Sequence, residues 1–150
     1  MIGLTEITEE NWLLFRSLSV LPEQSGFLDS ALGILARGYV YRESRARVFG
    51  ISEGETPVGL ALVKDLDDEP ACYDLQQFMI DGRYQRRGFG TEALKLIIAL
   101  LSRERKYGCV EVCVKSEDSA AIRLYEKAGF ADTGFIDEGA PGCVNMRLEF

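Results

Sequence analysis

The stretch of residues 81–107 places the strongest constraint on how this chain can fold. A polar, basic loop ends in the letters QRRGFG at residues 85–90 and leads directly into a segment whose apolar residues, such as Leu94 and Ile97, recur at helical spacing. Residues 73–80, just before the loop, are typical of a strand. A strand, a glycine-containing loop and a helix start bring unpaired backbone N–H groups and the positive end of a helix dipole together. Such a place suits an anion, and we expect a phosphate group there.

The glycines of this loop are Gly88 and Gly90. They let the backbone approach a ligand closely, because a Cβ would stand in the way, and they permit a positive φ. A P-loop is excluded, because no Gly-Lys-Ser/Thr follows. The letters GFGTEA at residues 88–93 fit a loose dinucleotide fingerprint, but there the glycines follow a first strand directly, whereas here residues 81–87 intervene. An ordinary glycine-containing loop before an amphipathic helix stays open as an alternative at this point.

Length and charge limit the classes of function. A chain of 150 residues predicts a single domain, residues 1–150, with one core. The net charge of -7 argues against nucleic acid as a partner and is compatible with a cationic substrate. We find no signal peptide and no apolar run of membrane-spanning length, so we expect a cytoplasmic protein without a membrane partner.

Histidine is absent, and the four cysteines form no Cys-x-x-Cys pair. Zinc sites of the usual kind, and serine or cysteine nucleophiles that need a histidine base, are therefore not expected. We predict chemistry without a metal, and cysteines that serve in packing.

The remaining pattern predicts a mixed α/β fold. The expected strands are residues 2–7, 48–52, 58–64, 72–80, 110–114, 131–137 and 143–150. The expected helices are residues 9–18 with Thr8 as N-cap, a second helix around residues 27–35 that stops near Gly38, a third from Gly90 that Gly108 can close, and a fourth, capped by Ser116 or Asp118, that runs to Ala128 with Gly129 at C′. Residues 65–70 read as an acidic loop. The long helix should join two parallel strands, 72–80 and 110–114, in a sheet that is otherwise antiparallel and has helices on both faces.

Two separated motifs resemble one family. The letters FMI at residues 78–80, followed by QRRGFG, resemble the Gln/Arg-x-x-Gly-x-Gly/Ala signature of the GNAT superfamily of acyl-CoA-dependent N-acyltransferases. The letters AIRLYEKAGF at residues 121–130 look like the A-x-x-L-Y-x-K-x-G-F segment of the same superfamily. The run Phe-Met-Ile-Asp before a Tyr-Gln loop also resembles the spermine/spermidine acetyltransferase branch. One departure is Asp118, which stands where the second motif commonly has Asn.

The resemblance implies a GNAT-like fold whose parallel strand pair splays at the site of acetyl-CoA. It implies that backbone N–H groups of residues 86–90 cradle the coenzyme A pyrophosphate and that the edge of residues 78–80 pairs with the pantetheine arm. The cofactor-binding residues expected on this basis are Phe78, Met79, Ile80, Gln85, Arg86, Arg87, Gly88, Phe89, Gly90, Thr91, Asp118, Ala121 and Tyr125.

Two residues are candidates for catalysis. The resemblance assigns Tyr125 to protonating the departing thiolate, and a tyrosine that only packs is the alternative. Asp74 occupies the position where some superfamily members carry a catalytic glutamate, and strand alternation would place it on one face with Gln76 and Phe78. A surface carboxylate at the start of a strand is the alternative for Asp74.

The predicted activity is transfer of an acetyl group from acetyl-CoA to a primary amine by direct attack in a ternary complex. The expected substrate is a small cationic amine such as a polyamine. A protein N-terminus or lysine is the alternative within this class, and a non-catalytic coenzyme A-binding regulatory module is the alternative of another class. Dimers are common among such proteins, so a homodimer is compatible with this interpretation.

Overall fold

The structure is a computed structural model that describes residues 1–150. Its centre is a seven-stranded sheet in the order β1-β2-β3-β4-β5-β7-β6. The strands are β1 Ile2–Glu6, β2 Arg47–Glu53, β3 Thr56–Leu66, β4 Cys72–Ile80, β5 Cys109–Lys115, β6 Ala131–Asp132 and β7 Cys143–Glu149. The helices are α1 Trp12–Arg16, α2 Ala31–Val40, α3 Phe89–Glu104 and α4 Ser119–Ala128, with short 3-10 turns at Pro22–Gln24, Arg42–Ser44 and Gly82–Tyr84. No helix is long and apolar enough to cross a membrane.

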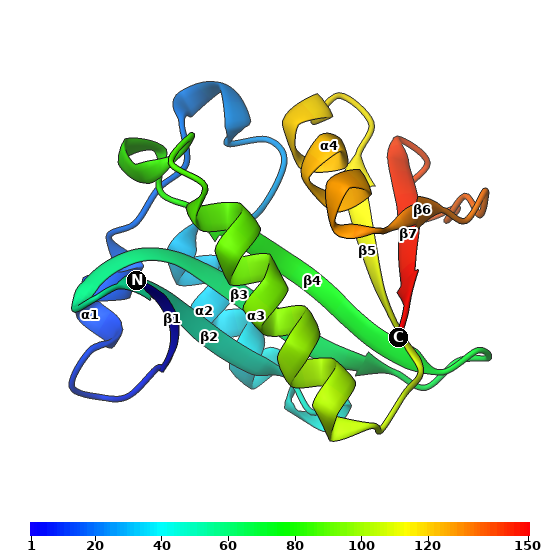
Figure 1. The fold of residues 1–150 in the computed structure, drawn as a ribbon, viewed down its shortest axis with the longest axis horizontal. Helices are drawn as coiled ribbons and strands as arrows, with labels where there is room; N and C mark the ends of the chain where they lie inside the picture. The colour runs from blue at the N-terminus through cyan, green and yellow to red at the C-terminus, as the bar shows by residue number, and fades with distance from the viewer.

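Helices cover both faces of the sheet. The long α3 and the shorter α4 lie on one face, and α1 and α2 lie on the other (Figure 1). The apolar side of α3, with Leu94, Ile97 and Leu101, packs on the larger core cluster, whereas Phe15 of α1 and Ile34 of α2 belong to a smaller cluster on the opposite face. The predicted fold class, a mixed sheet with helices on both faces, is confirmed.

The parallel pair β4–β5 is short. Its register holds only Tyr73 opposite Val110 and Asp74 opposite Glu111, and every other neighbouring pair in the sheet is antiparallel. Beyond these residues the two strands separate, so the second half of β4 has an open edge (Figure 1). This is the splayed parallel pair that was predicted.

The open edge of β4 carries main-chain groups that do not pair with β3. The N–H of Asp81 donates to the carbonyl of Val58 at 2.8 Å. Hydrogen-bonded and non-hydrogen-bonded pairs alternate in an antiparallel ladder, and Gly59 lies opposite Ile80. Phe78 and Ile80 therefore direct their N–H and C=O groups away from β3, into the gap where β5 has separated.

A β-bulge in β4 changes which residues share a face. The register to β3 passes from Leu62–Gln77 to Val63–Leu75, so Gln76 is the extra residue. Leu75 and Phe78 consequently both contact the core on the α3 face. Asp74, which neighbours Leu75 in a regular strand, therefore lies on the opposite face. The prediction that Asp74 shares a face with Phe78 is wrong, because the alternation breaks at Gln76.

Several helix ends differ from the expected ones. Helix α1 begins at Trp12, so its N-cap residue is Asn11 and not the predicted Thr8. The hydroxyl of Thr8 accepts from the N–H of Glu10 at 3.2 Å in the turn that precedes the helix. Helix α2 continues through Gly38, where a Cβ would come within 2.7 Å of Val48 Cγ2; this glycine permits close packing on β2 and does not end the helix. Helix α3 ends at Arg105, which takes the left-handed conformation with φ 57°, and not at Gly108.

The chain after α4 is also less regular than expected. Of the two expected caps of α4, it is Asp118 that accepts from the N–H of Ala121 at 3.2 Å, and Gly129 ends the helix with φ 105° as predicted. Strand β6, however, has two residues instead of the seven expected for residues 131–137. Its partner β7 lies between β5 and β6, so the last strand enters the sheet interior.

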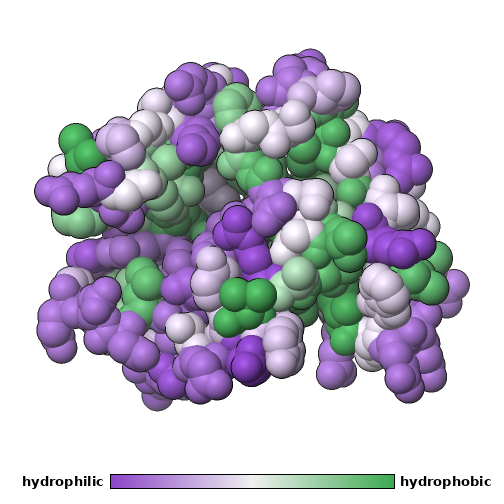
Figure 2. Space-filling view, turned by 180° about the vertical axis from the view of Figure 1, so that it is seen from behind, coloured by the Kyte–Doolittle hydropathy of each residue, from purple (hydrophilic) through white to green (hydrophobic).

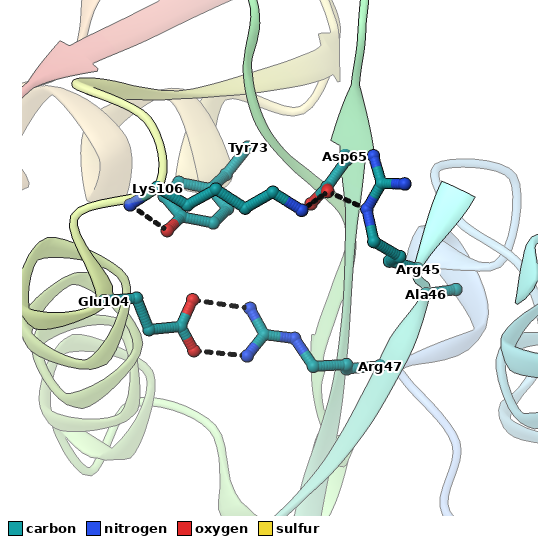
Figure 3. Close-up of a pocket in the computed structure, with 7 residues that line it drawn as sticks. All are labelled: Arg45, Ala46, Arg47, Asp65, Tyr73, Glu104 and Lys106. Carbon is teal, nitrogen blue, oxygen red and sulfur yellow. Dashed lines mark hydrogen bonds and ion pairs between the residues drawn. The ribbon is translucent and has the colours of Figure 1, made fainter. Parts of the chain in front are cut away.

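A cluster of charged side chains lies at the C-terminal end of α3 (Figure 3), whereas the loop of residues 85–90 leads into the N-terminal end of the same helix. Strand β3 extends into the stretch expected as an acidic loop, and its Asp65 is 5% exposed. The carboxylate of Asp65 accepts from Arg45 and Lys106, each at 2.5 Å, and from Tyr107 at 3.1 Å. Burial opposes ionisation, but these hydrogen bonds outweigh it and hold the pKa of Asp65 below its usual value.

Side chains of this cluster line a cavity of about 540 Å³. In Figure 3, Arg47 and Glu104 are paired beside Asp65. The charged side chains of the cavity are satisfied by one another. The cluster therefore ties the end of α3 to β2 and β3.

Candidate active site

A second cavity, of about 770 Å³, lies where β4 and β5 separate. Four stretches line it: residues 20–28, the end of β4, the loop into α3, and residues 117–127, which include most of α4. Figure 2 shows a hollow near the top of the molecule as seen from behind, bordered by hydrophilic and hydrophobic side chains. The two motifs of the sequence, at residues 85–90 and 121–130, thus meet at one cavity although strand β5 separates them in the chain.

The loop into α3 offers a row of main-chain donors. Arg86 and Gly88 have positive φ, 62° and 83°, and turn the chain into the helix. The N–H of Glu92 donates to the carbonyl of Gly88 at 3.1 Å and is the first helical donor, so the N–H groups of Phe89, Gly90 and Thr91 before it have no acceptor within the helix. Those groups and the N–H groups of residues 86–88 have no hydrogen-bond partner in the protein.

Space and charge at this loop fit an anionic diphosphate. A Cβ at Gly88 would meet no atom within 4 Å, so the loop is open above this residue. Three basic side chains line the same cavity, Arg86 from the loop and Arg123 and Lys127 from α4. Free N–H groups at a helix start together with cations are the usual means of holding phosphate. The residues present therefore fit the coenzyme A group that the sequence implied.

Most of the predicted cofactor residues line the cavity. They are Phe78, Met79, Ile80, Gln85, Arg86, Gly88, Gly90, Thr91, Asp118, Ala121 and Tyr125. Two side chains turn elsewhere: Arg87 donates to the carbonyl of Arg83 at 3.2 Å, and Phe89 packs against the core. The sequence analysis missed Arg123 and Lys127, although their spacing of four residues places them on one face of α4.

Buried carboxylate and amide groups hold the loop in place. Asp81 is 2% exposed, accepts from the N–H of Ser19 at 3.0 Å, and receives the guanidinium of Arg83 at 2.9 Å. Burial opposes its charge, but these donors prevail and lower the pKa of Asp81. Gln85 Nε2 donates to the carbonyl of Ile80 at 2.9 Å and to Gln24 Oε1 at 2.7 Å. Gln24 carries no motif and could not be assigned to the site from the sequence.

Tyr125 lines this cavity. Its side chain is buried, and its ring meets Phe130 edge to face at 5.3 Å between centroids. Burial and the charge of Asp118 act on its hydroxyl, and no hydrogen bond from another residue does. Burial raises the pKa of Tyr125 above its usual value, and the nearby charge of Asp118 raises it further. The phenol therefore stays protonated at neutral pH.

Asp74 lies apart from this group. It does not line the cavity, and its carboxylate is 3.6 Å from Lys64 Nζ in the closed part of the β4–β5 pair. Burial raises the pKa of Asp74 to about 6, although Lys64 acts in the opposite direction. The structure thus brings Tyr125 and the loop together but leaves the second catalytic candidate outside. No cluster of three or more His, Cys, Asp or Glu side chains could hold a metal ion.

The chain is similar to known acetyltransferases. The sequence model of the acetyltransferase (GNAT) family matches residues 4–130. A spermine/spermidine N(1)-acetyltransferase of Bacillus subtilis is 27% identical over 139 residues, which cover 91% of each chain.

Solved structures share the fold. An aminoglycoside acetyltransferase in complex with coenzyme A is 16% identical, with a TM-score of 0.81 over 99% of this chain and 95% of the other. An acetyltransferase from Thermus thermophilus is 20% identical, with a TM-score of 0.78 over 100% and 97%. Since the family model spans most of the chain, the protein belongs to the acetyltransferase (GNAT) family and is an N-acetyltransferase that uses acetyl-CoA.

Proposed function

We propose that this enzyme acetylates a primary amine of a small cationic compound such as a polyamine, by direct attack in a ternary complex. The observation that carries the proposal is one cavity that holds free loop N–H groups, the open edge of β4 and the hydroxyl of Tyr125. The name of the Bacillus subtilis relative supports the substrate class, as does the net charge of -7.

Main-chain groups form the part of the cavity that binds the coenzyme. The N–H groups of residues 86–91 hold the diphosphate, with Arg86, Arg123 and Lys127 beside it. The N–H and C=O of Phe78 and the N–H of Ile80 offer the edge groups on which a peptide-like arm can add as a strand, beside the Ile80 carbonyl that Gln85 already binds. Bound acetyl-CoA supplies an activated acyl group and a thiolate leaving group. The open edge aims that group at the middle of β4.

Tyr125 is the proposed acid. A buried phenol with a raised pKa is protonated at neutral pH, and no hydrogen bond to another residue competes for its hydroxyl. It can therefore donate its proton to the leaving sulfur as the C–S bond breaks. The proton that the amine loses restores the phenol through solvent.

Asp74 is the proposed base, acting through water. With a pKa of about 6 its carboxylate is ionised at neutral pH and can accept a proton. Because Asp74 does not line the cavity, a chain of water molecules must link it to the amine. Glu23 and Glu117, which do line the cavity, provide negative charge toward a polycationic acceptor.

A panel of amines tests this function. Acetyl-CoA is incubated with spermidine, spermine, a monoamine of similar length, and peptides with a free N-terminus or lysine, and acetylated products are measured by mass spectrometry. We expect kcat/KM to be highest for the polyamines and at least about tenfold lower for the monoamine, because the second cation is lost. Preferred acetylation of a peptide would replace the proposed substrate class, and coenzyme binding without any product would favour a regulatory module.

A further inference from the structure

A reciprocal amide pair connects the two sides of the cavity. Gln24 Nε2 donates to Gln85 Oε1 at 3.1 Å, and Gln85 Nε2 donates to Gln24 Oε1 at 2.7 Å. Both side chains are partly buried, and the two residues are 61 positions apart in the chain. Gln24 Oε1 also accepts from the N–H of Leu21 at 3.2 Å, which holds its own turn together. Both ends of this contact are thus oriented before any ligand binds.

The pair sits between the two proposed contacts of the coenzyme. Gln85 directly precedes Arg86, the first residue of the loop whose N–H groups face the diphosphate. The second hydrogen of Gln85 Nε2 goes to the carbonyl of Ile80, at the open edge of β4. Any ligand that steadies the loop or this edge must steady the side chain of Gln85 as well.

Gln24, the other member of the pair, lies on the side of the cavity where we expect the acceptor amine to bind. Gln24 ends the 3-10 turn Pro22–Gln24, and the residues around it, Glu23, Phe27 and Leu28, line the cavity. The base of this segment is held separately: Gly82 N–H donates to the carbonyl of Ser19 at 2.9 Å. A Cβ at Gly82 would approach Leu21 Cδ2 to 2.8 Å, so the two stretches are in direct contact there. The contact between residues 19–21 and Gly82 fixes the start of the segment, and the amide pair of Gln24 fixes the residues that follow.

We propose that Gln24 is a positioning residue that couples coenzyme binding to the order of the acceptor segment, residues 22–28, through its amide pair with Gln85. Fixing the loop on the diphosphate removes motion from Gln85, and Gln24 transmits this restriction to Glu23 and Phe27. The acceptor amine then binds to a segment that is already ordered, so less conformational entropy is lost when it binds. This is positive coupling between the two sites. The same coupling acts in reverse, from acceptor to coenzyme. This inference rests on coenzyme A binding at the loop.

Hydrogen exchange of the full chain with and without saturating coenzyme A tests the coupling, because it needs no acceptor. In the wild type we expect coenzyme A to slow amide exchange about fivefold or more both in residues 84–92 and in residues 22–28. Gln24→Ala should keep the slowing in residues 84–92 and lose it in residues 22–28. Direct contact of the coenzyme with the segment would survive this substitution, so it is distinguished from coupling.

Two further variants control for damage to the turn. Ser25→Ala removes the hydrogen bond of 2.9 Å from Ser25 Oγ to the carbonyl of Pro22 in the same turn, without touching Gln85, and should behave as the wild type. Gln85→Ala breaks the pair from the other end and leaves the bond between Gln24 and Leu21; it should reproduce the loss seen in Gln24→Ala. In turnover with spermidine, Gln24→Ala should raise the KM for the amine about fivefold and change kcat by less than about twofold.

The outcomes separate this inference from the proposed function. The coupling would be overturned if coenzyme A slowed amide exchange only in residues 84–92 of the wild type. It would also be overturned if the slowing in residues 22–28 persisted in Gln24→Ala. Either result would leave the coenzyme site intact. No slowing anywhere in the wild type would overturn the coenzyme assignment at the loop and the coupling with it.

Discussion

The ring of Tyr125 stands edge to face against the ring of Phe130, 5.3 Å between centroids, and the two residues are also joined by the main chain, where Phe130 N–H donates to the carbonyl of Tyr125 at 3.0 Å. The ring of Tyr125 is thus held by its packing on Phe130, and the main-chain hydrogen bond fixes the turn that brings the two rings together. The hydroxyl takes no part in this arrangement and remains available for chemistry.

Tyr125→Phe should therefore separate chemistry from structure. We expect kcat to fall about a hundredfold, because the thiolate loses its proton donor. The urea midpoint and the dissociation constant of coenzyme A should stay near the wild-type values, since the ring packing remains. A large loss of coenzyme affinity with unchanged kcat would remove Tyr125 from the acid role.

Gly88→Glu should weaken coenzyme A binding roughly a hundredfold. It places a side chain on a residue whose backbone is in the left-handed region, which strains the loop, and it adds a negative charge beside the diphosphate. Gly88→Asn is the matched control: asparagine tolerates positive φ and carries no charge, so the loss should be only a few-fold. Titration calorimetry with coenzyme A measures both. Equal affinities for the wild type and the glutamate variant would place the diphosphate elsewhere.

Asp74→Asn should change the pH dependence of turnover. The neutral fraction of the amine rises with pH, and in the wild type the ionised fraction of Asp74 rises as well up to its pKa of about 6. The logarithm of kcat/KM should then rise more steeply below pH 6 than above it, and this break should vanish in Asp74→Asn. A profile with the same break in both proteins would show that Asp74 is not the base.

Asp118 should act on helix α4 as an N-cap. Asp118→Ala removes the acceptor of the Ala121 N–H and should lower the free energy of unfolding by about 1 kcal/mol. Asp118→Asn keeps a capping oxygen and should differ from the wild type by less than about 0.5 kcal/mol. Urea denaturation measures both values, and equal stability of all three proteins would contradict the capping role.

Asp65→Asn should lower the free energy of unfolding at pH 7 by about 1–3 kcal/mol, because a buried carboxylate with three donors becomes a neutral amide. The pKa of Asp65 is depressed in the folded protein, so its contribution is present above its unfolded value of about 4 and is lost as pH falls through the folded pKa. The difference between wild type and variant should therefore shrink toward pH 3. Asp67→Asn, at a side chain 68% exposed, is the control and should change stability little.

The elements around the site were predictable because their causes are local. The strand–loop–helix order of residues 72–104 follows from apolar spacing and from glycines, and the cap at Asp118 and the stop at Gly129 follow from residue type. The splayed β4–β5 pair was predictable from the resemblance. The end of α3 was missed because Arg105 takes a left-handed conformation that residue type disfavours.

By itself the sequence determined which segments are helix, strand and turn near the loop, and which donors the loop presents. Only the tertiary structure decided that Gln76 is bulged out of β4, that Asp65 is buried among cations, and that Gln24 meets Gln85. These features depend on contacts between segments far apart in the chain. A side chain's partners at such distances are set by how whole elements pack, and neither spacing nor residue type carries that information.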